Sequence, residues 1–267
     1  RGHTHLMGSG LKAAATTREW LPVAAEMAQR LGLECLPEPV DRPAKLASPG
    51  LLLLVSDEGV SLQATGKKAP GPVRVDWVNG RSGHRRRQGG AELLVKAVGV
   101  ARASRPLRIL DATAGLGEDA LVLAGFESEL MLFEGSPVIA ELLADGMARA
   151  AREPALADRL ARMHLQHGDA TRWLADHPEA VDVVYLDPMF PEKRNSAAVR
   201  KEMQLARSVV GDDDDAAALL ETGLAAARHR VVVKRPRRAE PLSGPQPATS
   251  VEGRSSRFDV YSRRALP

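Results

Sequence analysis

The chain has 267 residues, 44% of them hydrophobic and 27% charged, and this balance favours a folded globular protein over a disordered chain. A single cysteine, Cys35, excludes an internal disulfide, and no Cys/His cluster or apolar run of membrane-spanning length is present, so we expect a cytoplasmic protein without metal or membrane contact. The formal net charge of +3 is a weak indication of an anionic partner.

The first part of the chain is predicted to form a small N-terminal α/β domain over residues 11–87, after a vector-derived tag remnant at 1–10. Apolar residues at helical spacing predict a helix over residues 17–31 that ends at Gly32. An Asp-Glu-Gly turn between two apolar runs predicts a hairpin, and a third apolar run follows it. The expected strands lie at residues 51–55, 60–65 and 72–78.

Residues 88–267 alternate short apolar strands with helices, which predicts a mostly parallel sheet covered on both faces. The strands are expected at residues 107–112, 129–134, 164–167, 181–186 and 230–234. The helices are expected near residues 90–102, 117–125, 136–151, 170–176, 196–208 and 213–228. Two late strands, at 249–252 and 257–264, have no helix between them, so the last strand should be antiparallel. This pattern favours the Rossmann-like α/β fold of class I methyltransferases.

A glycine-rich turn, DATAGLGEDA at residues 111–120, follows the first of these parallel strands and opens a helix. Gly115 and Gly117 let the backbone approach a ligand closely, and the helix that follows presents free N–H groups. Glu134 ends the next strand, where a carboxylate can accept both ribose hydroxyls of an adenosine. The turn also fits the dinucleotide-binding pattern, so by itself it predicts an adenosine-containing cofactor, with a purely structural turn as the alternative.

Acidic residues in and near this turn favour S-adenosylmethionine over NAD. Asp111, Glu118 and Asp119 would repel a pyrophosphate, whereas they would attract a sulfonium and an ammonium. Asp169, after the third parallel strand, can accept from the adenine amine, and the backbone N–H of Ala170 can reach the ring. A helix cap is an equally good explanation of Asp169. We expect S-adenosylmethionine as the cofactor.

The segment VVYLDPMFP, residues 183–191, runs an apolar strand into an Asp-Pro-x-Phe corner at the carboxyl edge of the sheet, where ligands bind. An exocyclic amine of a base is a poor nucleophile because its lone pair is delocalised into the ring. The Asp187 side chain and the Pro188 carbonyl can accept its N–H protons, and Phe190 can stack on the base. The motif therefore predicts methylation of such an amine, mainly by positioning. A strand-ending turn without a catalytic role is the alternative.

Together these motifs resemble the ribosomal RNA small-subunit methyltransferase J family, whose members make N2-methylguanosine near the 3′ end of the small-subunit RNA. The matching stretches are VDWVNG (75–80), HRRR (84–87), VKAVG (95–99), DATAGLGEDA (111–120), SPVIAELLADGMARA (136–150), VVYLDPMFP (183–191), KEM (201–203), VVVKRP (231–236) and RFDVY (257–261). The resemblance implies that the cofactor and target-amine site is lined by Glu118, Asp119, Glu134, Gly135, Asp169, Ala170 and Asp187. Met189 departs from the generic amine-methylase motif, which has a second proline there.

Basic residues near the predicted site could neutralise RNA phosphates, with plain solvated charge as the alternative. These residues are His84, Arg85, Arg86, Arg87, Lys193, Arg194, Lys234 and Arg235. The resemblance implies 16S ribosomal RNA or the assembling 30S subunit as partner, and the N2 amine of a guanosine as target. The alternatives are another base in DNA or RNA, a protein glutamine, an NAD-dependent oxidoreductase, and a non-catalytic RNA-binding module.

Overall fold

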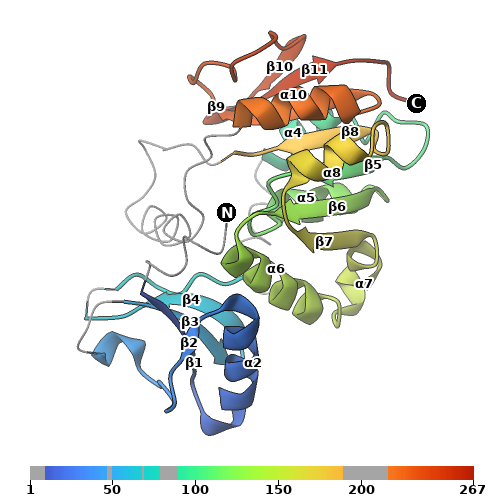
Figure 1. Cartoon of the computed structure of the whole chain (residues 1–267). Coiled ribbons are helices and arrows are strands. Elements are labelled where there is room, and N and C mark those ends of the chain that lie inside the picture. The colour runs from blue at the N-terminus through green and yellow to red at the C-terminus, as the bar shows by residue number, and fades with distance from the viewer. Residues whose placement is uncertain (1–9, 47–49, 68, 79–89, 189–215) are drawn as a thin grey trace. The chain divides into compact units, whose positions relative to one another are not determined.

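The computed structural model describes residues 10–46, 50–67, 69–78, 90–188 and 216–267 (Figure 1). Contacts divide the chain into two compact units. The first unit contains the described parts of Arg1–Val75 together with Ser136–Arg149. The second contains the described parts of Asp76–Gly135, Ala150–Glu192 and Asp212–Pro267. Among the helices of these ranges, none is long and apolar enough to cross a membrane.

The first unit is built on a four-stranded sheet in the order β2-β1-β3-β4. Its strands are β1 (Leu11–Ala15), β2 (Glu34–Cys35), β3 (Leu51–Ser56) and β4 (Gly59–Ala64). β1 is parallel to β2 and β3, whereas β3 and β4 form the expected antiparallel hairpin. Gly59 closes this hairpin with a φ of 101°, a conformation that favours glycine. β1 and β2 were not expected from the sequence.

Helix α2 (Leu21–Leu31) covers this sheet and confirms the helix expected over residues 17–31, although its first turn is the 3-10 helix η1 (Arg18–Trp20). Its buried residues recur at helical spacing, and they are Ala24, Met27, Ala28 and Leu31. The helix ends at Gly32, whose φ of 67° is left-handed. A second 3-10 helix, η2 (Pro43–Lys45), follows in the chain.

The prediction of a strand at residues 72–78 is wrong. Only Val73 pairs with a neighbour, in an isolated antiparallel bridge to Leu62. Pro70 and Pro72 have no backbone N–H to donate, so a continuous ladder cannot form beside β4. Val75 and Trp77 are nevertheless buried, which explains the apolar pattern of this segment.

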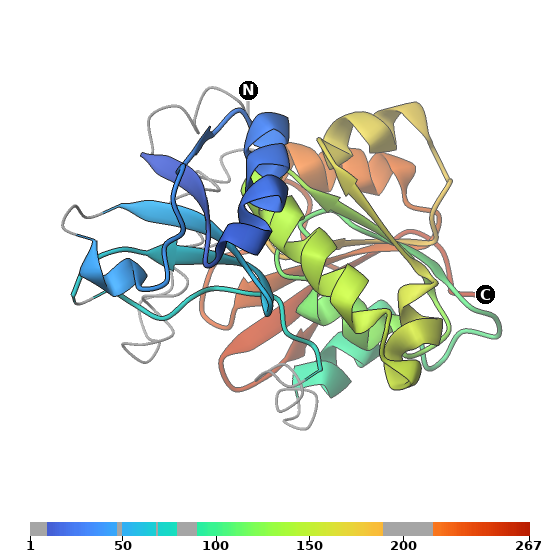
Figure 2. The same ribbon diagram turned by 90° about the horizontal axis from the view of Figure 1, so that it is seen from below.

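Helix α6 (Pro137–Ala150) packs within the first unit, which the sequence pattern did not predict. Arg30 of α2 donates to Glu141 of α6 at 2.6 Å, and the two helices run side by side (Figure 2). Asp145 accepts a 3.0 Å hydrogen bond from the Val60 N–H. A Cβ on Gly146 would lie 2.2 Å from the Val75 side chain, so this close approach requires glycine.

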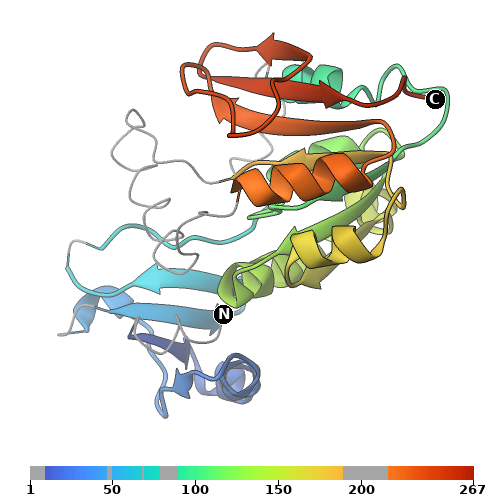
Figure 3. The ribbon, with the colours of Figure 1, turned by 45° about the horizontal axis from the view of Figure 1, so that its top comes forward.

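The second unit contains a seven-stranded sheet in the order β10-β11-β9-β8-β5-β6-β7. Its strands are β5 (Arg108–Asp111), β6 (Glu129–Glu134), β7 (Met163–His167), β8 (Val183–Leu186), β9 (Arg230–Pro236), β10 (Thr249–Glu252) and β11 (Ser256–Ser262). The strands β5 to β9 pair in parallel, whereas β11 lies antiparallel between β9 and β10 (Figure 3). This confirms the mostly parallel sheet with an antiparallel last strand.

Helices cover both faces of this sheet. They are α4 (Gly90–Val98), α5 (Glu118–Ala124), α7 (Pro154–Leu160), α8 (Ala170–Asp176) and α10 (Ala216–Ala226). α8 and α10 pack against each other (Figure 1). Their Leu174 and Leu220 join the strand residues Leu110, Val184 and Val231 in one core cluster. The short helix α7 was not expected. The helix expected at residues 196–208 lies outside the described residues.

The strand order reverses at β5. The chain continues from β5 to β6 and β7 on one side, and returns to β8 and β9 on the other. In open α/β sheets ligands bind at the carboxyl ends of the strands where this reversal occurs. The topology therefore places the glycine-rich turn after β5 and the Asp-Pro corner after β8 at the same edge.

Candidate active site

The turn after β5 is held by backbone hydrogen bonds to both neighbouring strands. The Ala112 N–H donates to the Tyr185 carbonyl of β8 at 3.0 Å, and the Ala114 N–H donates to the Phe133 carbonyl of β6 at 2.9 Å. Gly115 has a φ of 53° and Gly117, which precedes α5, a φ of 72°. Both glycines therefore adopt the left-handed conformation that the motif suggested.

Glu134 lies against this turn. Its Oε2 accepts the Gly115 N–H at 2.9 Å, and Glu134 is only 7% exposed. The next residue, Gly135, has open space where a Cβ would stand. The structure thus brings together the glycine turn and the acid that sequence reasoning paired with it.

Asp111 adds a buried carboxyl group to the same edge. It accepts the Thr113 N–H at 3.1 Å. Burial raises the pKa of Asp111 well above its usual range, the Thr113 hydrogen bond opposes this, and the charges of Asp119, Asp187 and Glu134 raise the pKa further. Four acidic side chains therefore influence one another at this end of the sheet.

Lys234 connects two of these acids. Its Nζ donates to Asp119 Oδ2 and to Asp187 Oδ2, each at 2.8 Å. Burial lowers the pKa of Lys234, but Asp187 and Asp119 raise it by more, so the ammonium stays charged. Sequence reasoning assigned Lys234 to RNA phosphates, which stays a prediction, and it missed this carboxylate pairing.

Tyr185 is a further residue that sequence reasoning missed. Its hydroxyl donates to Asp119 Oδ2 at 2.6 Å, and the side chain is buried in β8. Burial raises the pKa of Tyr185 well above its usual value, and the carboxylates of Asp119 and Asp187 raise it further. The hydroxyl therefore stays protonated and acts as a donor to Asp119.

The Asp-Pro corner is tied to the glycine turn. The Asp187 N–H donates to Thr113 Oγ1 at 2.6 Å, and Pro188 is buried. The Asp187 side chain is 37% exposed, so it faces both Lys234 and solvent. Phe190, the predicted stacking ring, lies outside the described residues.

Asp169 acts as the N-cap of α8, which confirms the helix-cap interpretation. Its Oδ1 accepts the Thr171 N–H at 2.8 Å, and Ala170, the first helical residue, is buried. Trp173 of α8 contacts Phe133 at a ring separation of 5.8 Å and stacks on His177 at 4.3 Å. A contact of Asp169 or Ala170 with adenine stays a prediction.

Glu118, another residue expected at the cofactor site, is the first residue of α5.

The basic residues predicted to bind RNA are only partly within the described residues. The residues His84, Arg85, Arg86, Arg87, Lys193 and Arg194 fall outside them. Arg235 is buried, and its Nε donates to the Glu240 carbonyl at 3.0 Å. A role of Arg235 in phosphate binding stays a prediction.

The carboxylates suit a positively charged ligand better than a phosphate. Asp119, Glu134 and Asp187 outnumber the Lys234 ammonium that pairs with two of them, so the glycine turn has a negative surrounding that matches a sulfonium with an ammonium. In the described part of the chain no group of His, Cys, Asp and Glu side chains could hold a metal ion.

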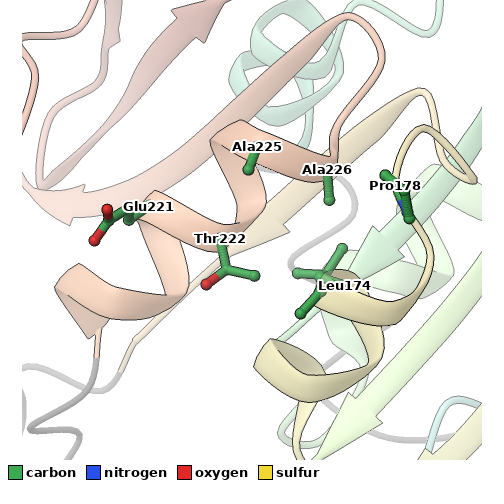
Figure 4. A pocket seen from close by; sticks show the side chains of 7 residues that line it. Leu174, Pro178, Glu221, Thr222, Ala225 and Ala226 are labelled. Carbon is green, nitrogen blue, oxygen red and sulfur yellow. The ribbon is translucent and has the colours of Figure 1, made fainter.

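A separate depression lies between α8 and α10 (Figure 4). Its volume is about 270 Å³, and it is lined by Leu174, Ala175, Pro178, Glu221, Thr222, Ala225 and Ala226. None of these residues belongs to the carboxylate-rich edge. We assign no role to this depression.

Comparison with known proteins gives consistent results. The SAM-dependent methyltransferase family model matches residues 44–263. The protein named ribosomal RNA small subunit methyltransferase J from Marinobacter nauticus is 53% identical over 248 residues, which are 92% of this chain and 88% of that protein. Its namesake from Pseudomonas fluorescens is 47% identical over 262 residues, 96% of each chain. The crystal structure of a SAM-dependent methyltransferase from Neisseria gonorrhoeae is 33% identical, with a TM-score of 0.70 over 94% of this chain and 95% of the other.

Proposed function

Because this chain belongs to the ribosomal RNA small subunit methyltransferase J family of S-adenosylmethionine-dependent methyltransferases, we propose that it methylates the exocyclic N2 amine of a guanosine in 16S ribosomal RNA. The observation that carries the proposal is the 2.6 Å hydrogen bond from the Asp187 N–H to Thr113 Oγ1. It holds the acid of the target-amine corner beside the glycine turn of the cofactor.

The residues of this edge fit the cofactor. S-adenosylmethionine, when bound, supplies a methyl group that is already activated on a sulfonium. Glu134 would accept the ribose hydroxyls, and Asp169 with the Ala170 N–H would bind the adenine. The positively charged end would be held by the acids of the turn and its surroundings, with close backbone approach at the glycines. These residues are Asp111, Gly115, Gly117, Glu118, Asp119 and Gly135.

Asp187 and Pro188 would hold the target amine. The Asp187 carboxylate accepts one N–H of the amine and the Pro188 carbonyl accepts the other, which frees the nitrogen lone pair. The nitrogen must lose one proton after it gains the methyl group, and the Asp187 carboxylate would take it. Phe190 would stack on the guanine and orient it. The main contribution to the rate is positioning.

The names of the relatives support small-subunit ribosomal RNA as the substrate, and the choice of guanine rests on the family resemblance of the sequence motifs. The basic residues at 84–87 and 193–194, together with Arg235, would contact phosphates of the RNA or of the assembling 30S subunit. The methyltransferase domain would span residues 88–267 and the small N-terminal domain residues 11–87. An amino-methyltransferase acting on another base, or on a protein glutamine, is the competing assignment.

The test is a methylation assay with methyl-labelled S-adenosylmethionine. Naked 16S RNA, 30S subunits from cells that lack the protein, DNA and total protein are offered separately, and the products are digested and identified by mass spectrometry. We expect label in N2-methylguanosine of the RNA or the subunit. Label in another nucleoside, in DNA or in glutamine would overturn the proposal.

An Asp187→Ala variant tests the mechanism in the same assay. It should abolish methyl transfer while the melting temperature stays close to that of the original protein. The Kd for S-adenosylmethionine should change by less than a factor of about three, or roughly 0.6 kcal/mol. Full activity of this variant would remove the proposed role of Asp187.

A further inference from the structure

Lys234 is placed by the pairing of β8 with β9. The two strands are parallel, and Val233 is the register partner of Leu186. The next residues, Lys234 within β9 and Asp187 directly after β8, therefore lie at the same level along the two strands. The Lys234 ammonium uses this position to reach the Asp187 carboxylate at 2.8 Å.

The same ammonium reaches the cofactor side of the edge. Its second 2.8 Å hydrogen bond goes to Asp119 Oδ2, in the first turn of α5 directly after the glycine turn. The Tyr185 hydroxyl donates to the same oxygen from β8. A chain of polar contacts thus runs from Tyr185 through Asp119 and Lys234 to Asp187.

This arrangement disfavours a phosphate as the partner of Lys234. An ammonium between two carboxylates at 2.8 Å has its charge compensated locally, so it attracts a distant phosphate weakly. The Lys234 side chain is 29% exposed, and the side chains of Asp119 and Asp187 are 30% and 37% exposed. All three are half-buried, so the contacts are less screened than those of surface pairs.

We propose that Lys234 is a positioning residue for methyl transfer: its ammonium holds the Asp187 carboxylate in the orientation that accepts the target amine, and links it through Asp119 to the cofactor turn. The inference rests on the role of Asp187 in the proposed function. An acceptor displaced by about 1 Å can lower a rate about 100-fold, because the reacting atoms must meet in a narrow range of geometry. The loss should therefore appear in the rate of the bound complex and leave RNA affinity unchanged.

The experiment compares Lys234→Met, which removes the charge at similar length, with Lys234→Arg, which keeps it. Arg238→Met is the matched control, because it removes an exposed basic side chain four residues along the chain. Single-turnover rates are measured with saturating RNA and S-adenosylmethionine, and Kd values for both ligands are measured separately. Melting temperatures show whether each variant is folded, and Lys234→Gln replaces Lys234→Met if the latter does not melt cooperatively.

We expect Lys234→Met to lower the single-turnover rate about 100-fold with an RNA Kd within about threefold of the original. Lys234→Arg should keep at least about one tenth of the original single-turnover rate. Arg238→Met should have the same single-turnover rate as the original protein. An unchanged rate in Lys234→Met, or a weaker RNA Kd at an unchanged saturated rate, would overturn the inference. If the original protein makes no N2-methylguanosine, the proposed function fails instead, so the two failures are distinguishable.

Discussion

The Glu134 carboxylate accepts a 2.9 Å hydrogen bond from the Gly115 backbone N–H. One acid at the end of β6 therefore stabilises the turn that follows β5, and the same acid is the proposed ribose ligand. One side chain therefore contributes both to the shape of the turn and to the proposed binding of the ribose. Substitutions of Glu134 should affect both.

Glu134→Ala should raise the Kd for S-adenosylmethionine at least about tenfold, equivalent to about 1.4 kcal/mol, because the variant loses the ribose acceptor and leaves the Gly115 N–H without this partner. Glu134→Gln retains an oxygen that can accept from Gly115, so its loss should be smaller. Isothermal titration calorimetry measures both values. Glu129→Ala, at the exposed start of the same strand, is the control, and equal affinity of the Glu134→Ala and control variants would contradict the prediction.

Gly115→Ala should lower the free energy of unfolding by about 1 kcal/mol, because a residue with a Cβ is strained at a φ of 53°. The added Cβ would meet no atom closer than 3.9 Å, so the cost comes from the backbone conformation. Urea unfolding without cofactor measures it. Gly135→Ala, where a Cβ meets open space at an ordinary φ, should change stability by less than about 0.5 kcal/mol. Equal losses in the two variants would argue against strain at Gly115.

Asp111→Asn should raise the melting temperature at pH 8. Burial, followed by the charges of nearby acids, raises the pKa of Asp111 in the folded state above its usual 3.8. A group with a raised folded pKa contributes stability that is complete below pH 3.8 and is lost as the pH rises through the folded value. Asparagine avoids that loss, and each kcal/mol gained corresponds to about 2–4 °C in a domain of this size.

Melting curves from pH 4 to pH 8 test this prediction for Asp111. The advantage of the asparagine variant should shrink as the pH approaches 4, whereas Asp176→Asn, at an exposed position of α8, should show no such trend. A melting temperature of Asp111→Asn below that of the original protein at pH 8 would show that the carboxylate is stabilising there.

Asp182→Ala should destabilise the protein by about 1.5–3 kcal/mol. Asp182 precedes β8, is 1% exposed, and accepts from Arg105 at 2.8 and 2.9 Å and from the Arg108 N–H at 2.9 Å. Burial raises the pKa of Asp182, but these hydrogen bonds and the charges of Arg105 and His229 lower it by more. Its stabilisation is therefore present at neutral pH and is lost as the pH falls through the lowered folded value.

Urea unfolding at pH 7 and in acid checks the effect of Asp182→Ala. Because Asp182 and Asp187 flank opposite ends of β8, methyl transfer at a temperature where the variant is folded should stay within about twofold of the original. A large loss of activity with unchanged stability would contradict this assignment of Asp182 to the fold.

Replacement of Arg85, Arg86 and Arg87 together by Ala should weaken RNA binding and flatten its salt dependence. Each lost phosphate contact lowers the slope of log K against log salt by about 0.7–0.9. Binding assays between 50 and 200 mM salt measure the slope, and the triple Lys variant should keep it. An unchanged salt slope in the Ala variant would show that these arginines do not contact RNA phosphates and are ordinary surface charges.

Patterns that depend on neighbours along the chain were predictable. The end of α2 at Gly32 and the hairpin closed at Gly59 follow from the conformational freedom of glycine, and the strand that ends at Glu134 follows from a short apolar run. The expected strand at 72–78 failed because burial of Val75 and Trp77 gives an apolar pattern without a hydrogen-bonded ladder.

The sequence by itself determined the two motifs, their acids and the alternation of strands and helices, because each depends on local geometry and on the chemistry of single side chains. Only the tertiary structure decided that Lys234 lies between Asp119 and Asp187, and that α6 packs with the first unit. Contacts of this kind depend on the order of strands in the sheet and on the packing of distant segments. A lysine that follows an apolar run looks the same in the sequence whether its side chain faces a phosphate or a pair of carboxylates. The parallel pairing of β9 with β8 is what places Lys234 beside Asp187.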